Sequence, residues 1–157
     1  MTGACDLLTT PLGTLTLEAS ERGLTGLRFV HRNKRGADSP GNSEIIALAK
    51  RELNAYFAHR LNRFTVPLDW QGTPFQESVW EALLEIPFGE TVSYGDIARA
   101  IDRPQSARPV GGAVGRNPLP IIVPCHRVIG SDQTLTGFTG GLNLKVALLE
   151  IEGLRFE

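Results

Sequence analysis

The first third of the chain alternates polar and apolar residues, a pattern that is typical of β-strands. The alternation covers residues 14–19, and a second β-rich run covers residues 24–30. Glu, Arg and Gly at positions 21–23 separate the two runs and favour a turn. The pattern therefore predicts a β-hairpin near the start of the chain.

A helix is predicted after a polar loop. Apolar residues recur at helical spacing from residue 45 to about residue 58, and Asn42 or Ser43 can cap this helix. Residues 64–68 return to a short strand pattern. The stretch 69–72 is then the best candidate for a domain boundary, because successive short helices replace strands after it.

Three short helices with tight turns follow this boundary. Residues 73–76 read Thr-Pro-Phe-Gln, which is a capping box with Pro at the first helical position. Residues 93–96 have the same cap spacing, and a third helix is predicted from residue 105 or 106 to about Gly115. This succession predicts a helix-turn-helix of the winged-helix-like kind.

The last third combines a buried segment with a final helix. Residues 121–123 read as an apolar extended piece, and Asn143 is predicted to cap a helix that ends at Glu152. The expected fold class is α+β. A small N-terminal sheet-plus-helix domain would cover residues 1–68, and a mainly helical C-terminal domain would cover residues 69–157.

Composition excludes several classes of protein. Apolar residues make up 41% of the 157 residues and charged residues 21%, as in soluble globular domains, so disorder and fibrous repeats do not fit. No apolar run approaches the ~20 residues of a membrane span, and residues 1–12 hold no signal-peptide core. Only Cys5 and Cys125 are present, which suits two free thiols in the reducing cytoplasm better than a disulfide.

Charge is balanced overall but uneven locally. The net charge of −1 makes no global case for nucleic acid. Between residues 99 and 127, however, a single acidic residue, Asp102, accompanies five arginines: Arg99, Arg103, Arg108, Arg116 and Arg127. This excess predicts a basic stripe suited to a polyanion.

The sequence Pro-Cys-His-Arg at 124–127 is the strongest candidate for chemistry. It places the thiol of Cys125 beside an imidazole and a guanidinium, and positive neighbours favour the reactive thiolate. If the segment continues the apolar strand before it, Cys125 and His126 point to opposite faces and would communicate through a water molecule. Taken alone, the Cys-His pair fits a small buried cysteine at least as well as a nucleophile.

The surrounding sequence changes that balance. Residues 108–130 read RPVGGAVGRNPLPIIVPCHRVIG, preceded by VSYGDIA at 92–98 and followed by GFTGG at 137–141. In this combination the chain resembles the O6-alkylguanine-DNA alkyltransferases, which repair alkylated guanine and are consumed by the reaction. The resemblance is dense over residues 73–153 and thinner before them.

The resemblance implies a catalytic role for five residues. Cys125 would accept the alkyl group, and His126 would act as the base through a water molecule. Glu152 would hold the other nitrogen of that histidine. Asn117 would be the hinge between the helix-turn-helix and the active-site segment. Tyr94 would bind DNA by crowding the target's phosphate and would donate a proton to the departing base. Without the family, Glu152 would read as an exposed carboxylate, Asn117 as a turn residue and Tyr94 as half-buried core.

The resemblance also implies how DNA is bound. The alkylated oxygen faces into the duplex, so the nucleotide must be flipped out. The third helix would enter the minor groove with Gly111, Gly112 and Val114 at its surface, and Arg108 would replace the flipped base. Glycine costs roughly 1 kcal/mol relative to alanine in a helix, so something must require its small size. Close helix–helix packing is the competing explanation.

A pocket for the flipped base completes the expected site. The backbone carbonyls of Cys125 and Val128 would accept hydrogen bonds from the guanine amino group, Thr139 N–H would reach the oxygen, and Gly140 would leave room for the alkyl group. Phe138 would stack on the base; some members of the family have tyrosine there. No metal and no cofactor are expected. Some relatives bind zinc through two cysteines and two histidines, but Ser20 and Thr25 occupy two of those places here.

The expected function is single-turnover transfer from O6-alkylguanine, with O4-alkylthymine as a further substrate, in double-stranded DNA. The protein would act as a monomer in solution, and the sequence leaves cooperative binding along DNA open. Two other classes compete with this hypothesis. A lesion-binding protein of the alkyltransferase-like kind would lack the acceptor cysteine, and a Cys-His hydrolase would need an oxyanion hole that no motif supplies.

Overall fold

The computed structural model describes residues 3–29, 43–130 and 141–154 of the chain. It divides into two compact units, Met1–Gln71 and Gly72–Glu157. Each unit has a core of its own. In the described ranges, no helix is both long and apolar enough to cross a membrane.

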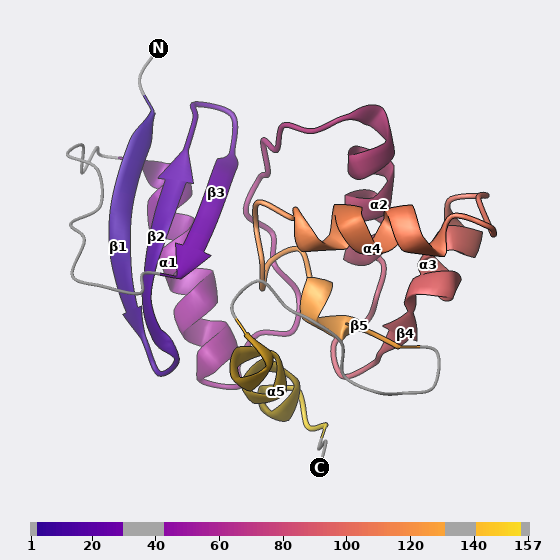
Figure 1. Ribbon diagram of the computed structural model, residues 1–157. Coiled ribbons are helices and arrows are strands. Elements are labelled where there is room, and N and C mark those ends of the chain that lie inside the picture. Colours follow the sequence, from indigo (N-terminus) through magenta and orange to yellow (C-terminus); the bar gives the residue numbers. More distant parts are fainter. Residues whose placement is uncertain (1–2, 30–42, 131–140, 155–157) are drawn as a thin grey trace. The chain divides into compact units, whose positions relative to one another are not determined.

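The first unit is a three-stranded antiparallel sheet with one helix packed on it (Figure 1). Strands β1 (Ala4–Thr10), β2 (Gly13–Ala19) and β3 (Leu24–Phe29) follow one another in space as in sequence. The alternation along β2 buries Leu15, Leu17 and Ala19, as the period of two requires. The predicted hairpin is β2–β3, and β1 adds a strand that was not predicted.

Helix α1 (Glu44–Phe57) covers the sheet of this unit. Ser43 caps it by accepting a hydrogen bond from Ile46 N, as predicted. The short strand predicted at residues 64–68 is wrong except for a single bridge between Leu24 and Leu68. The buried carboxylate of Glu52 takes up the N–H groups of residues 65 and 66, and Pro67 has none, so few donors are left for a strand.

The second unit begins with three short helices, α2 (Pro74–Leu84), α3 (Tyr94–Ala100) and α4 (Ala107–Gly115), which pack against one another (Figure 1). Both predicted capping boxes are confirmed, at Thr73 before α2 and at Ser93 before α3. Trp80 of α2 is fully buried, and its Nε1 donates to the carbonyl oxygen of Ala113 in α4 at 2.9 Å. This bond fixes α4 on the other two helices.

The rest of the unit holds the segment that carries Cys125. A short 3₁₀ turn, η1 (Cys125–Arg127), leads into β5 (Val128–Ile129), which pairs in parallel with β4 (Val92–Ser93). Helix α5 (Leu142–Ile151) packs against η1. The expected α+β class is confirmed.

Two local predictions in this unit are wrong. Residues 121–123 are buried but form a turn, with Ile121 at φ +77° and Val123 N bonded to Leu119 O. Asn143 does not cap the last helix. Gly141 does, at φ +96°, a conformation that glycine adopts easily and that side chains disfavour.

Candidate active site

Cys125 opens the 3₁₀ turn η1 and is almost completely buried, with 5% of its surface exposed. The expected extended segment is therefore not present here, and the inference that Cys125 and His126 point to opposite faces does not apply. A 3₁₀ turn has three residues per turn, so successive side chains are rotated by about 120°. Cys125, His126 and Arg127 thus diverge from one compact turn, and all three are buried.

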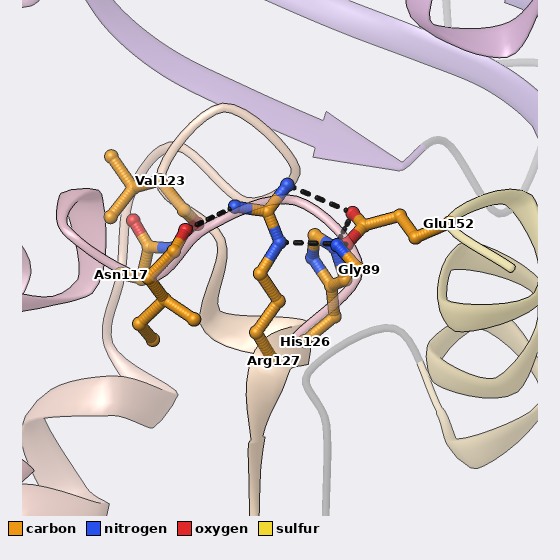
Figure 2. Close-up of polar contacts among 7 residues, drawn as sticks. Gly89, Asn117, Val123, His126, Arg127 and Glu152 are labelled. Carbon is orange, nitrogen blue, oxygen red and sulfur yellow. Dashed lines mark hydrogen bonds and ion pairs between the residues drawn. The ribbon is translucent and has the colours of Figure 1, made fainter. Parts of the chain in front are cut away.

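The carboxylate of Glu152 is the centre of a buried polar network (Figure 2). Its Oε1 accepts from Gly89 N at 3.0 Å and from Arg127 Nε at 2.8 Å. Its Oε2 accepts from Arg127 Nη2 at 3.0 Å and lies 2.6 Å from His126 Nε2. Glu152, at the C-terminal end of α5, is therefore not the exposed carboxylate that its position alone suggests.

This network defines the protonation of His126. The carboxylate of Glu152 is ion-paired with Arg127 and can only accept hydrogen bonds. Nε2 of His126 therefore carries the proton in the 2.6 Å contact. Burial lowers the pKa of His126, although Glu152 raises it, and Arg127 and Lys145 lower it further. The imidazole is therefore neutral near pH 7. The lone pair of Nδ1 is buried, has no hydrogen-bond partner among the described residues, and can act as an acceptor.

Burial raises the pKa of the Cys125 thiol to about 11. A hydrogen bond from the Asn117 side chain and the charge of Lys145 act in the opposite direction but do not outweigh burial. Burial thus outweighs the positive neighbours that favour a thiolate, and the guanidinium of Arg127 bonds Glu152. Cys125 rests as a thiol that must lose its proton to react.

Lys145 is a buried cation that the sequence reasoning missed. Only 1% of its surface is exposed, and its Nζ donates to the carbonyl oxygen of Val128 at 2.6 Å. Burial lowers its pKa, while the sulfur of Cys125 raises it. A single lysine within the apolar run of α5 is the only signal in the sequence, and such a residue is more often exposed.

Asn117 ties the chain after α4 to the active-site segment. Its Nδ2 donates to Val123 O at 2.8 Å, and its Oδ1 accepts from Leu119 N at 2.9 Å. The same side chain bonds to Cys125. These contacts produce the buried turn at residues 121–123 and fit the expected hinge position better than an ordinary Asn-Pro turn.

The glycines of α4 differ in their surroundings. A Cβ atom on Gly111 would lie 3.7 Å from Cδ1 of the half-buried Tyr94, which is an ordinary contact. A Cβ atom on Gly112 or Gly115 would meet nothing within 4 Å. Close packing within the described protein thus does not require glycine at these positions. Val114, expected at the surface, is buried with 7% of its surface exposed.

The basic stripe is smaller than predicted. Arg127 is buried in the Glu152 network, and Arg99 forms an ion pair with Asp96. Three exposed arginines remain: Arg103 in the turn between α3 and α4, Arg108 in the first turn of α4, and Arg116 at its C-cap. A positive surface therefore remains around α4, but its members are fewer than the five arginines counted in sequence.

The expected base pocket is described in part. Val128 is fully buried, and its carbonyl oxygen already accepts from Lys145. Phe138, Thr139 and Gly140 lie outside the described residues. Over the ranges that the structure describes, no group of three His, Cys, Asp or Glu side chains could hold a metal ion.

Comparison with known proteins covers both units. The sequence model of the family "6-O-methylguanine DNA methyltransferase, DNA binding domain" matches residues 74–154. The sequence model of the family "6-O-methylguanine DNA methyltransferase, ribonuclease-like domain" matches residues 4–70. A methylated-DNA–protein-cysteine methyltransferase of Methanosarcina barkeri is 47% identical over 150 residues, which are 94% of this chain and 95% of the relative.

A protein of the same name from Mycobacterium tuberculosis is 50% identical over 147 residues, 92% of this chain and 89% of the relative. Among solved structures, the crystal structure of Mycobacterium tuberculosis OGT in complex with DNA is similar, with a TM-score of 0.84 and 50% identity. The match covers 93% of this chain and 90% of that one.

Proposed function

The chain belongs to the 6-O-methylguanine DNA methyltransferase family, and on that premise we propose that it transfers the alkyl group of O6-alkylguanine in double-stranded DNA irreversibly to Cys125. As an enzyme it is a methylated-DNA–protein-cysteine methyltransferase that acts in the repair of DNA. O4-alkylthymine is proposed as a further substrate, because it too carries the alkyl group on an exocyclic oxygen.

The observation that carries this proposal is the buried thiol of Cys125 in one turn with a neutral histidine, whose Nδ1 has no hydrogen-bond partner in the described part of the chain and can accept a proton. His126 takes the thiol proton, directly or through water, and Glu152 stabilises the imidazolium that forms. The sulfur then forms a bond to the alkyl carbon, and the bond from that carbon to O6 breaks. The electron pair stays on the guanine, which takes up a proton from Tyr94.

The product is a thioether, and it explains why the reaction would stop after one turnover. A thioether sulfur has no proton to lose, and hydrolysis of its carbon–sulfur bond would require a second nucleophile in a buried site. The number of moles of guanine repaired should therefore not exceed the number of moles of protein added. Continued product formation beyond this amount would favour the Cys-His hydrolase, and DNA binding without any repair would favour the lesion-binding protein.

We propose that α4 of the domain at residues 69–157 enters the minor groove and that the target nucleotide is flipped toward Cys125. Support comes from the exposed Gly112, where a Cβ atom would meet no atom of the described residues within 4 Å. A helix with bare backbone on its exposed side can approach DNA closely. Gly111 and Arg108 belong to the proposed surface, while the buried Val114 would support it from below.

Gly112→Ala tests this surface. Alanine should stabilise the folded protein by about 1 kcal/mol, because it is the better helix former and its Cβ meets no neighbour. The same methyl group should weaken duplex binding by about tenfold, or ~1.4 kcal/mol, because it would hold the backbone away from the groove. Urea unfolding and fluorescence anisotropy measure the two effects. A stabilised protein with unchanged affinity would remove α4 from the interface.

Arg108→Ala tests whether the side chain of Arg108 fills the place of the flipped base. Repair should slow about tenfold more in duplex than in single-stranded DNA, or ~1.4 kcal/mol, because only a duplex has a stack to fill. Arg116→Ala is the matched control, since it removes the same charge from the exposed C-cap of α4. Both substrates should respond equally to the control. Equal losses in Arg108→Ala would reduce this residue to a phosphate contact.

The remaining parts of the expected site are proposed on the same basis. The carbonyl of Val128 has a second lone pair beside the one that Lys145 uses, so it can still accept from the guanine amino group. Phe138, Thr139 and Gly140 would stack on the base, bind its oxygen and leave room for the alkyl group. We also propose that the protein works without cofactor or metal, as a monomer in the reducing cytoplasm, which would keep Cys125 reduced.

A further inference from the structure

Arg127 is the one member of the buried network to which the proposed reaction gives no part. Its guanidinium donates two hydrogen bonds to Glu152, from Nε to Oε1 at 2.8 Å and from Nη2 to Oε2 at 3.0 Å. A third bond, from Nη1, reaches the carbonyl oxygen of Ile86 at 2.6 Å, and the guanidinium carbon lies 5.8 Å from the centre of the Phe88 ring. Arg127 is 6% exposed, so solvent hardly screens these contacts.

The charges around His126 come from two elements. The turn η1 contributes Cys125 and Arg127, and α5 contributes Lys145 and Glu152. The segment before β4 adds the backbone groups Ile86 O and Gly89 N and the uncharged ring of Phe88. Within the described residues, Glu152 is therefore the only anion in contact with His126, and Arg127 is the cation bonded directly to it.

This arrangement has a consequence for the proton on the imidazole. A lone buried carboxylate next to histidine favours the imidazolium, because the two opposite charges then compensate each other. An arginine paired with that carboxylate offsets part of this effect, because its positive charge lowers the pKa of His126. The carboxylate can still accept the N–H of Nε2, and so holds the ring in the tautomer that leaves Nδ1 without a proton.

We infer that Arg127 is a positioning residue that offsets the charge of Glu152 and so, together with burial, keeps His126 an uncharged base for Cys125. The inference rests on the proposed function for the importance of the base. The geometry of Glu152, His126 and Arg127 exists without DNA, however, so the inference can be tested on the free protein. Arg127 never touches the alkyl group or the sulfur in this account, and its effect passes through Glu152.

The test follows the imidazole nitrogens of His126 by NMR while pH is changed. In the wild-type protein the ring should remain neutral at pH 7 with its proton on Nε2. Arg127→Met should raise the pH at which His126 becomes protonated by about 1–3 units, because the carboxylate loses its cation. Arg127→Lys keeps the positive charge but cannot form the two parallel hydrogen bonds of the guanidinium, and it should shift this pH by much less. Arg116→Met, which removes an exposed arginine, should leave it unchanged.

A double variant separates charge from structure. Arg127→Met together with Glu152→Gln removes both charges, and His126 should then titrate near its wild-type pH again, which loss of packing alone would not produce. The acid limb of the transfer rate should move with the NMR titration in every variant that transfers.

Two results would overturn the inference. One is an imidazolium, or a proton on Nδ1, in the wild-type protein at pH 7, a measurement that needs no variant to fold. The other is an unshifted titration in folded Arg127→Met. Absence of transfer in the wild-type protein with the NMR behaviour intact would instead contradict the proposed function.

Discussion

Cys125→Ser is expected to abolish alkyl transfer completely and to leave binding to duplex DNA within about twofold of the wild-type affinity. Serine keeps the size of the side chain but replaces sulfur with an oxygen that is a much weaker nucleophile toward a saturated carbon. The side chain is 5% exposed, so the exchange hardly alters the surface that DNA would meet. Repair assays on methylated duplex and fluorescence anisotropy measure the two quantities.

The second cysteine of the chain provides the matched control. Cys5 is buried to nearly the same degree, 7% exposed, but it lies in β1 of the other unit. Cys5→Ser should therefore carry a similar burial cost and retain full transfer. Loss of transfer in Cys5→Ser together with retained transfer in Cys125→Ser would show that the acceptor is misassigned.

Glu152→Ala is expected to lower the free energy of unfolding by about 3–5 kcal/mol, because it breaks a buried ion pair and leaves the charge of Arg127 without a partner. The substitution also removes the acceptor for Gly89 N and for His126 Nε2. Urea unfolding of the free protein measures the loss. Transfer should fall as well, even without urea, where the variant is still folded, because His126 loses the contact that sets its tautomer.

Glu150→Ala is the control for this prediction. Glu150 lies two residues earlier in α5 and is exposed, so its removal should change the free energy of unfolding by no more than about 0.5 kcal/mol. Similar stabilities for the two variants would mean that the network around Glu152 contributes little to the fold.

The caps of the second unit could be predicted because they are local. Thr73 with Gln76, and Ser93 with Asp96, bond to each other across three residues, so the sequence itself contains both partners. The predicted start of α5 at Asn143 was wrong. Asparagine is a good cap in general, but Gly141, two residues earlier, takes the cap position with a positive φ.

The residue types of the candidate site were identifiable from the motif, but their protonation was not. Arg127 follows Cys125 closely in sequence, which suggested a thiolate, yet its guanidinium bonds Glu152, 25 residues away, and Ile86, 41 residues away. The pKa of Cys125 is then governed by burial, which depends on how the whole unit packs around it. The buried Lys145 was missed for the same reason, since nothing local to it specifies its partner Val128.

The central claim is that one alkyl group passes from DNA to the sulfur of Cys125. The most direct measurement incubates the protein with a duplex whose O6-methylguanine carries an isotopically labelled methyl group, and then maps the label by peptide mass spectrometry. One labelled methyl group per chain is expected on Cys125, together with unmodified guanine in the DNA. Label on any other residue, or repaired DNA with an unlabelled protein, would contradict it.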